Sequence, residues 1–288
     1  MVRLISWNVA QRKVAWRFLA DSDADIALLQ EAAEPPADVA EKFEVDPAPW
    51  RTVGAEQNRR WRAAVVKLSD RVGVQWLELK SLHEAQAGEL AVSRLGTLAA
   101  AKVIPSSGDP FIVASMYALW EKPHSATGSA WIYADGSAHR LISDLSMLIG
   151  KQSNHSILAA GDLNVLYGYG EGGNAYWESR YTTVFSRMSA LGLSFVGPQA
   201  PAGRPAQPWP NELPRTSKNV PTCCTRYQTP ATATRQLDFV FASNSLSERV
   251  CVRALNEPDH WGPSDHCRVR IEVHDHPQPR ACQTTRDA

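Results

Sequence analysis

The sequence lacks an excess of charge of either sign. Thirty basic and thirty acidic residues give a formal net charge of zero at pH 7. Long-range attraction to a polyanion, on which strongly basic nucleic-acid-binding proteins rely, is therefore excluded as the main source of affinity. The balance still permits a local basic surface, because arginine and lysine residues occur in short clusters.

Long apolar runs are also absent. No stretch approaches the ~18 consecutive apolar residues that a membrane-spanning helix requires. Residues 1–5 run directly into Trp7 and Asn8, which leaves no room for a secretory signal peptide. We therefore expect a cytoplasmic protein without a membrane segment.

Cysteine is scarce and poorly spaced for metal binding. The chain has five cysteines and no Cys-x-x-Cys motif. Cys223 and Cys224 are adjacent, and neighbouring cysteines do not easily serve one zinc ion. We expect all five thiols to be reduced and no structural zinc site.

Strand-like and helix-like segments are mixed along the chain, and each half begins with a strand–helix–strand pattern. The proline-rich segment 197–236 has little periodicity and is expected to form a long ordered loop. No linker divides the chain, so we expect one domain over residues 1–273 and a disordered polar tail over 274–288. Apolar runs predict strands, and helical spacing predicts helices at 13–21, 138–151 and 180–191; the strands are expected at 2–9, 25–30, 62–68, 72–79, 97–104, 111–118, 156–160, 237–241 and 251–255.

Polar side chains stand at or near the ends of six predicted strands. Each has an ordinary explanation when taken alone: a solvated strand end, a turn former, a core tyrosine or a structural histidine. Their joint occurrence indicates a site, because carboxylates, amides and imidazoles are the groups that bind hard cations and transfer protons. The motifs are Trp7-Asn8, Gln30-Glu31, Met116-Tyr117-Ala118, Gly161-Asp162-Leu163-Asn164, Leu237-Asp238-Phe239 and Ser264-Asp265-His266.

In this order the motifs resemble those of the endonuclease/exonuclease/phosphatase superfamily, over nearly the whole chain. The resemblance implies an α+β fold, a four-layer αββα sandwich of two packed mixed β-sheets flanked by helices, as in DNase I. It also implies a hydrolase of phosphoric esters. The chain departs from many DNA-repair members at Ala10 and Gln11, where an acidic or amide residue and a glycine are usual, which argues against abasic-site activity.

The resemblance assigns a metal site to three residues. Glu31 takes the place of the principal metal ligand, and Asn8 and Asp265 are expected near the metal or its waters. A hard cation held by few carboxylates keeps water ligands and neutralises charge on a phosphate. Mg²⁺ is the expected cofactor, and Mn²⁺ should substitute.

Five further residues take catalytic positions by the same resemblance. Asp162 can align and deprotonate the attacking water, and Asn164 can position that carboxylate or the phosphate. His266, made cationic by its partner Asp238, can stabilise developing charge. Tyr117 matches the position of a phosphate-contacting residue in nuclease members.

Basic residues interleaved with tryptophan suggest how a substrate binds. Arg12, Lys13, Arg59, Arg60 and Arg62 are candidate contacts to a nucleic-acid backbone. The leading prediction is a Mg²⁺-dependent nuclease acting on DNA or RNA as a monomer. Two alternatives stay open: a phosphatase or phosphodiesterase acting on a small-molecule, inositol or lipid phosphate, and a catalytically inactive binding module.

Overall fold

The computed structural model describes residues 1–52, 58–121, 134–150 and 154–278. A first six-stranded sheet has the order β13-β14-β1-β2-β4-β3. Within it, β1 pairs parallel with β2 and antiparallel with β14, so the two ends of the described chain meet in one sheet. Its strands are β1 (Val2–Asn8), β2 (Ile26–Ala32), β3 (Glu44–Val45), β4 (Arg62–Lys67), β13 (Val250–Leu255) and β14 (Arg268–Val273).

A second six-stranded sheet has the order β11-β12-β10-β9-β8-β5. Here β10 pairs parallel with β9 and antiparallel with β12, so this sheet is mixed like the first. A separate parallel pair, β6 (Lys80–Ser81) and β7 (Ala91–Val92), lies outside both sheets. The strands of the second sheet are β5 (Val72–Leu77), β8 (Leu98–Pro105), β9 (Phe111–Tyr117), β10 (Ile157–Asp162), β11 (Leu193–Gly197) and β12 (Asp238–Ser243).

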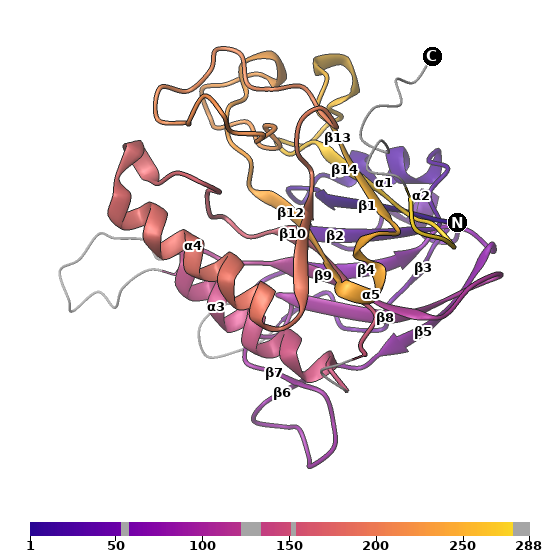
Figure 1. Ribbon diagram of the computed structural model, residues 1–288. Helices are drawn as coiled ribbons and strands as arrows, with labels where there is room; N and C mark the ends of the chain where they lie inside the picture. The colour runs from indigo at the N-terminus through magenta and orange to yellow at the C-terminus, as the bar shows by residue number, and fades with distance from the viewer. Residues whose placement is uncertain (53–57, 122–133, 151–153, 279–288) are drawn as a thin grey trace.

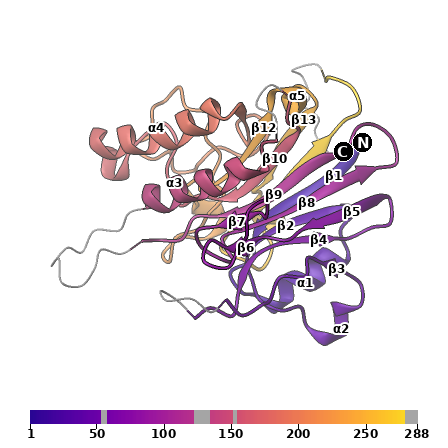
Figure 2. The same ribbon diagram turned by 90° about the horizontal axis from the view of Figure 1, so that it is seen from below.

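Helices cover the outer face of each sheet (Figures 1 and 2). The first sheet carries α1 and α2, and the second carries α3 and α4. The bounds are α1 (Lys13–Ala20), α2 (Ala37–Ala40), α3 (Ala134–Leu145), α4 (Ala175–Ala190) and α5 (Asn244–Ser247), with 3-10 turns at Ser146–Leu148, Glu171–Gly173, Pro230–Thr232 and Pro258–His260.

Side-chain alternation in β1 explains how the layers hold together. Leu4 belongs to the apolar cluster between the two sheets, whereas Ile5 and Trp7 belong to the cluster beneath α1. A strand with both faces covered is buried along its length, and in β1 only Arg3 is not fully buried. Burying each such side chain contributes about 1.5–3 kcal/mol. The result is a four-layer αββα sandwich, which confirms the predicted fold class.

Strand pairing brings the sequence motifs to one edge of the sandwich. Because β1 and β2 are parallel, Asn8 pairs in register with Gln30, next to Glu31. In the second sheet Asp162 pairs with Tyr117 on β9 and with Asp238 on β12. Four strand ends and one strand start therefore meet at the same edge.

Several expected boundaries differ from the structure. The helix predicted at 180–191 begins earlier, because Asn174 caps α4 by accepting a hydrogen bond from the Tyr176 N–H. The helix predicted at 138–151 is shifted to Ala134–Leu145 plus one 3-10 turn. The prediction also missed β11 and β14, although β14 alternates buried and half-buried residues, as a strand with one buried face should.

Part of the predicted disordered tail is tied down. The N–H groups of His274 and Gln278 donate to the carbonyls of Arg249 and Glu248 beside β13. Asp275 accepts the N-terminal amine at 3.1 Å. The prediction is therefore wrong for residues 274–278, and residues 279–288 lie outside the described part of the chain.

The composition predicted reduced cysteines and no membrane-spanning segment, and the structure bears on both. Cys251 on β13 is disulfide-bonded, so the expectation of five reduced cysteines is wrong. Cys223, Cys224 and Cys267 are free thiols. None of the helices in the described residues combines the length and apolarity needed to cross a membrane.

Candidate active site

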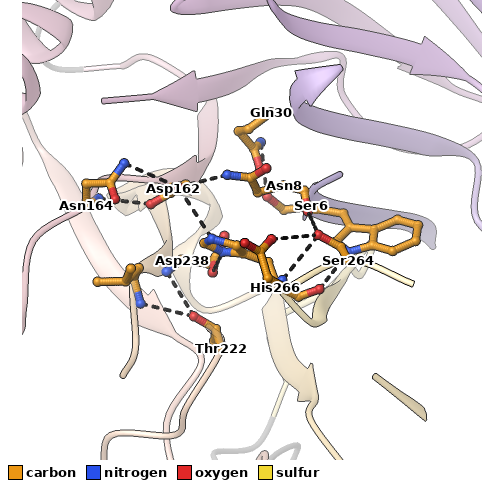
Figure 3. Close-up of polar contacts among 12 residues, drawn as sticks. Ser6, Asn8, Gln30, Asp162, Asn164, Thr222, Asp238, Ser264 and His266 are labelled. Carbon is orange, nitrogen blue, oxygen red and sulfur yellow. Dashed lines mark hydrogen bonds and ion pairs between the residues drawn. The ribbon is translucent and has the colours of Figure 1, made fainter. Parts of the chain in front are cut away.

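Asp162, at the end of β10, is the hub of the polar contacts at this edge (Figure 3). It is 1% exposed, and its Oδ2 accepts the Asn8 amide at 2.9 Å. Its Oδ1 accepts the backbone N–H of Asn164 at 2.9 Å. Burial raises the pKa of Asp162, although His266 and the Asn8 amide oppose the rise. A carboxylate with a raised pKa at a strand end is suited to accept a proton.

His266 lies opposite Asp162 and is held by Asp238. The His266 Nδ1 is 2.8 Å from the Asp238 Oδ2, and its Nε2 is 3.8 Å from the Asp162 Oδ2. Burial alone would lower the pKa of His266, but Asp238 and Asp162 hold it well above the ordinary value. The two carboxylates therefore favour the protonated form of His266, whose Nε2 side is directed toward Asp162.

The backbone that carries the Asp238 side chain is held in place by Thr222. The Thr222 hydroxyl accepts the backbone N–H groups of Leu237 at 3.0 Å and Asp238 at 3.1 Å (Figure 3). The Asp238 Oδ1 is buried without a hydrogen-bond partner among the described residues. Thr222 belongs to the irregular segment after β11. This segment therefore holds the start of β12 at the site.

Glu31 is the half-buried carboxylate of the site. Its Oε1 accepts the Tyr117 hydroxyl at 2.9 Å and the Asn8 amide at 3.3 Å. The Gln11 amide reaches its Oε2 at 3.3 Å. Burial and the nearby Glu31 charge raise the pKa of Tyr117, so its hydroxyl keeps its proton and donates. Asn8 thus joins Glu31 to Asp162 through one amide.

Unusual backbone conformations gather at this edge. Ala10, Gln11, Glu31 and Asn164 have φ values of +45°, +60°, +47° and +52°, and they are the only non-glycine residues with positive φ in the described ranges. Such conformations are uncommon for side chains other than glycine and persist where surrounding structure enforces them. Their concentration here marks the same edge that the polar contacts mark.

The close approach of β10 to β9 explains why the Gly-Asp-x-Asn motif begins with a glycine, Gly161. Its φ is +153°, and a Cβ at this position would lie 1.9 Å from the carbonyl oxygen of Met116 on β9. No side chain fits there, because van der Waals contact requires a far larger separation. The glycine lets β10 approach β9 closely where Asp162 leaves the strand.

The Ser264-Asp265-His266 segment is anchored to β1. The Ser264 hydroxyl donates to the Asn8 carbonyl at 2.7 Å, and the Trp7 indole donates to the His266 carbonyl at 2.9 Å. Asp265 is exposed, and within the described residues its carboxylate accepts only the Ser264 hydroxyl, at 3.3 Å. Asp265 is thus next to the site without a direct contact to Glu31.

Among the predicted basic contacts, Arg59 is buried beside the site. It is 7% exposed, its Nη2 donates to the Leu95 carbonyl, and its guanidinium lies 4.9 Å from the Trp61 ring centre. Burial and Arg94 lower the pKa of Arg59, an effect that Tyr117 and Glu31 partly offset. Its Nε and Nη1 are buried without hydrogen-bond partners among the described residues.

Arg62 does not fit the predicted role. It is 1% exposed, and its Nη1 forms an ion pair of 2.8 Å with Asp46. Its Nη2 donates to the Asp46 carbonyl, and its guanidinium stacks 4.3 Å from the Trp50 ring centre. The prediction that Arg62 contacts substrate is therefore wrong, because the side chain is buried and paired. Arg12, Lys13 and Arg60 are exposed.

The donor set fits a hard divalent cation. In the described residues no group of three or more His, Cys, Asp or Glu side chains is placed to enclose a metal. This edge of the sandwich instead carries the carboxylates of Glu31, Asp162 and Asp238 and few positively charged side chains. Among the described residues, the Asp238 Oδ1 has no hydrogen-bond partner. Magnesium is commonly held by one or two carboxylates and retains several waters. Glu31 and Asn8, with Asp265 nearby, are the residues that fit such a site.

Sequence reasoning missed two supporting residues. Gln11, treated only as a departure from the usual glycine, donates to Glu31. Thr222 had no recognisable signal, since it lies in an irregular segment 16 residues before the Asp238 N–H that it accepts.

The fold matches solved structures with very different sequences. The endonuclease domain of TRAS1, a telomere-specific non-LTR retrotransposon, matches with a TM-score of 0.57 at 16% identity, covering 95% of this chain and 98% of that one. The AP endonuclease LMAP from Leishmania major matches with a TM-score of 0.58 at 17% identity, covering 95% and 88%. A variant of the 3' phosphatase NExo from Neisseria, bound to product DNA hairpin, gives 0.56 at 16%, covering 95% and 99%.

Sequence comparison defines the family more directly. No curated protein matches the chain at a significant level. The model of the endonuclease/exonuclease/phosphatase family matches residues 5–266, which include every candidate catalytic and metal-site residue described above. The chain therefore belongs to the endonuclease/exonuclease/phosphatase family, whose members are phosphoester hydrolases.

Proposed function

We propose that the protein is a Mg²⁺-dependent nuclease that hydrolyses phosphodiester bonds of DNA or RNA. The observation that carries the proposal is the unbroken series of polar contacts from Glu31 through Asn8 and Asp162 to His266, spanning both sheets. Such a series would set a metal-binding end and a cationic end on either side of one phosphate position. It is supported by the family and by solved relatives described as endonucleases and as a DNA-bound phosphatase.

The residues of the chain divide the work of hydrolysis. Asp162 accepts the proton of the attacking water, since its pKa is raised by burial and its orientation is fixed by Asn8 and Asn164. His266, kept protonated by Asp238, faces the negative charge that develops on the phosphoryl oxygens. Tyr117 holds Glu31 in place and, by the family resemblance, contacts the phosphate.

Glu31 and Asn8, with Asp265 beside them, would hold the divalent cation. When bound, Mg²⁺ or Mn²⁺ supplies positive charge to a phosphate oxygen and to the leaving oxygen. Glu31, Asp162 and Asp238 place three carboxylates at this edge, whose negative charge a bound cation would partly offset. The identity of the metal rests on the oxygen donor set.

Substrate binding rests on fewer cations than the sequence suggested. Arg59 is the strongest candidate, because a buried guanidinium with unpaired donors is costly unless an anion completes it. Arg12, Lys13 and Arg60 are exposed and available for flanking phosphates. We further propose that residues 1–273 act as one monomeric domain, since the first and last strands pair in the same sheet. A cytoplasmic location stays a prediction, and the disulfide at Cys251 is unusual for that compartment.

A second candidate function is a phosphatase or phosphodiesterase acting on a small-molecule or inositol phosphate. The observation that favours it is the loss of Arg62 from the basic surface, which reduces the cations available for a long polyanion. The net charge of zero points the same way.

A cleavage panel decides between the two candidates. Single- and double-stranded DNA, RNA, abasic DNA and inositol polyphosphates would be incubated with the protein at fixed Mg²⁺, and products separated by size. We expect cleavage of at least one nucleic acid and none of the inositol phosphates. Hydrolysis confined to inositol phosphates would establish the second candidate instead.

A further inference from the structure

A cavity of about 560 Å³ lies beside the catalytic edge, between the loop 46–52 and the strands β5 and β8. This volume is within the range of sites that bind small ligands. Nothing in the catalytic contacts described above uses it. Its walls are largely apolar and include Pro47, Leu77, Leu79, Leu95 and Leu98.

The cavity is joined directly to the buried cation of the active site. Thr52, which lines the cavity, exchanges two backbone hydrogen bonds with Arg59, of 3.0 and 3.2 Å. The Arg59 Nη2 donates to the carbonyl of Leu95, another wall residue. Arg62 in the wall pairs in register with Ala32, the residue after Glu31. A group that fills the cavity is therefore adjacent to a phosphate held by Arg59.

The charges of the wall exclude a phosphate in the cavity itself. Its lining carries Asp46, Glu78 and Glu84 against Arg51 and Arg62. Asp46 and Arg62 neutralise one another in their ion pair, which leaves two carboxylates and one guanidinium. An anionic ligand would meet net repulsion, whereas a neutral ligand would not.

Two polar atoms of the wall residues lack partners. The Thr52 Oγ1 and the Arg62 Nε are buried without a hydrogen-bond partner among the described residues. Unpaired buried donors cost free energy, so a ligand with ring nitrogens or carbonyl oxygens gains by supplying acceptors after small side-chain rotations. Glu78 and Glu84 are exposed on the rim, where they can accept from an exocyclic amine.

We propose that this cavity receives a nucleobase of the substrate, from the nucleotide whose phosphate contacts Arg59. The inference rests on the nuclease function proposed above and adds a base-recognition site to it. A neutral, flat heterocycle with hydrogen-bonding edges matches the apolar walls, the unpaired polar atoms and the exclusion of anions. One base held in this way would fix the register of the strand relative to Glu31.

A spacer-scanning experiment tests the proposal. Pentanucleotides, each with a single abasic spacer at a different position, would be titrated against the protein carrying Glu31→Gln to prevent cleavage. We expect one spacer position to weaken binding by about tenfold, the size usual for one stacked base. In the same background Leu79→Trp, which fills the cavity, should abolish the loss of affinity caused by the spacer at that position. Thr52→Val should reduce this loss.

Two matched variants control for surface effects. Leu82→Trp adds the same ring at a residue that is 58% exposed, and Thr182→Val removes an exposed hydroxyl from α4. Both should leave the spacer sensitivity unchanged. Circular dichroism and thermal unfolding confirm that Leu79→Trp folds, and Thr52→Val gives an independent result if it does not.

The outcomes separate the cavity from the activity. No sensitive position, or a sensitivity that survives both Leu79→Trp and Thr52→Val, overturns the base site even if the parent protein cleaves nucleic acid. Failure of the parent with intact Glu31 to hydrolyse any nucleic acid refutes the proposed function. The titration still reports on the cavity in that case.

Discussion

Two aspartates at opposite ends of the sandwich both have almost no exposed surface, but their surroundings differ. Asp25 is 2% exposed and Asp162 is 1% exposed. Burial tends to raise the pKa of Asp25, but it is outweighed by hydrogen bonds from the Arg3 N–H, the Ser69 hydroxyl and the Arg71 guanidinium, so its pKa is lowered. Asp162 is more deeply buried and, among the described residues, accepts hydrogen bonds from amide groups alone, so burial raises its pKa.

The difference separates a structural carboxylate from the one that we propose to be reactive. A full set of donors including a guanidinium locks Asp25 in its charged form and ties the start of β2 to the start of β1. Burial, and to a smaller extent the nearby Asp238 charge, disfavour the charged form of Asp162 and raise its pKa. Such a state persists at functional sites because the fold elsewhere stabilises it.

The largest effect is expected from Asp162→Asn. Turnover should fall by about 10²-fold or more, the usual contribution of a positioned base. The thermal unfolding midpoint should fall only modestly. The single amide oxygen of the variant keeps one of the two hydrogen bonds, from Asn8 or from the Asn164 N–H, and the substitution also removes a buried charge. Steady-state kinetics and calorimetry on the same preparation measure both. A large loss of stability with unchanged turnover would reverse the roles assigned to the two aspartates.

The next effect concerns the partner of Asp162. His266→Ala should lower turnover by about 10²-fold, and Asp238→Asn should act through His266. Because the two side chains form one hydrogen-bonded pair at 2.8 Å, the double variant should lose far less than the product of the single losses. Independent, multiplicative losses in the kinetic cycle would show that they do not act as a pair.

A smaller effect is expected from substituting Asp25, the structural aspartate. Asp25→Asn should lower the free energy of unfolding by about 1–3 kcal/mol, the range for charged hydrogen bonds, and leave turnover unchanged. Because the folded-state pKa of Asp25 is lowered, its contribution is present above the unfolded pKa and is lost as pH falls through the folded pKa. Urea titrations from about pH 6 to pH 2 should show the variant and parent converging in acid. A stability difference independent of pH would contradict this.

The smallest effect compares two buried arginines. Arg59→Gln should weaken nucleic-acid binding and flatten its salt dependence by roughly 0.7 to 0.9 log units per lost phosphate contact. Arg62→Gln should destabilise the fold instead, since it leaves Asp46 buried and unpaired. Binding titrations at several salt concentrations, with thermal unfolding, distinguish the two. Equal effects of both variants on binding would place Arg62 back among the substrate contacts.

The fold and the catalytic motifs could be predicted because their signals are local. An apolar run followed by Gln30-Glu31 or Gly161-Asp162 specifies a strand and the group at its end, and the family resemblance orders them. The match of the family model over residues 5–266 and the two six-stranded sheets confirm the family and the fold, whereas the catalytic roles of the motif residues stay predictions.

The remaining features depend on contacts that are distant in sequence. Arg62 resembles Arg59 in the sequence, and only the ion pair with Asp46, 16 residues away, distinguishes them. The support of Asp238 by Thr222 requires an irregular segment to fold back onto β12. Short strands such as β3, of two residues, are too brief to carry a periodic signal.

The most direct test of a metal-dependent hydrolase at this edge is the chelator-sensitive hydrolysis of an oligonucleotide by the parent and by Glu31→Gln. Glu34→Gln, an exposed glutamate three residues further along the chain, is the matched control. We predict that excess chelator stops the parent, that Glu31→Gln is nearly inactive while folded, and that Glu34→Gln matches the parent. Cleavage that persists in chelator, or a Glu31→Gln variant with the parent rate, would contradict the account.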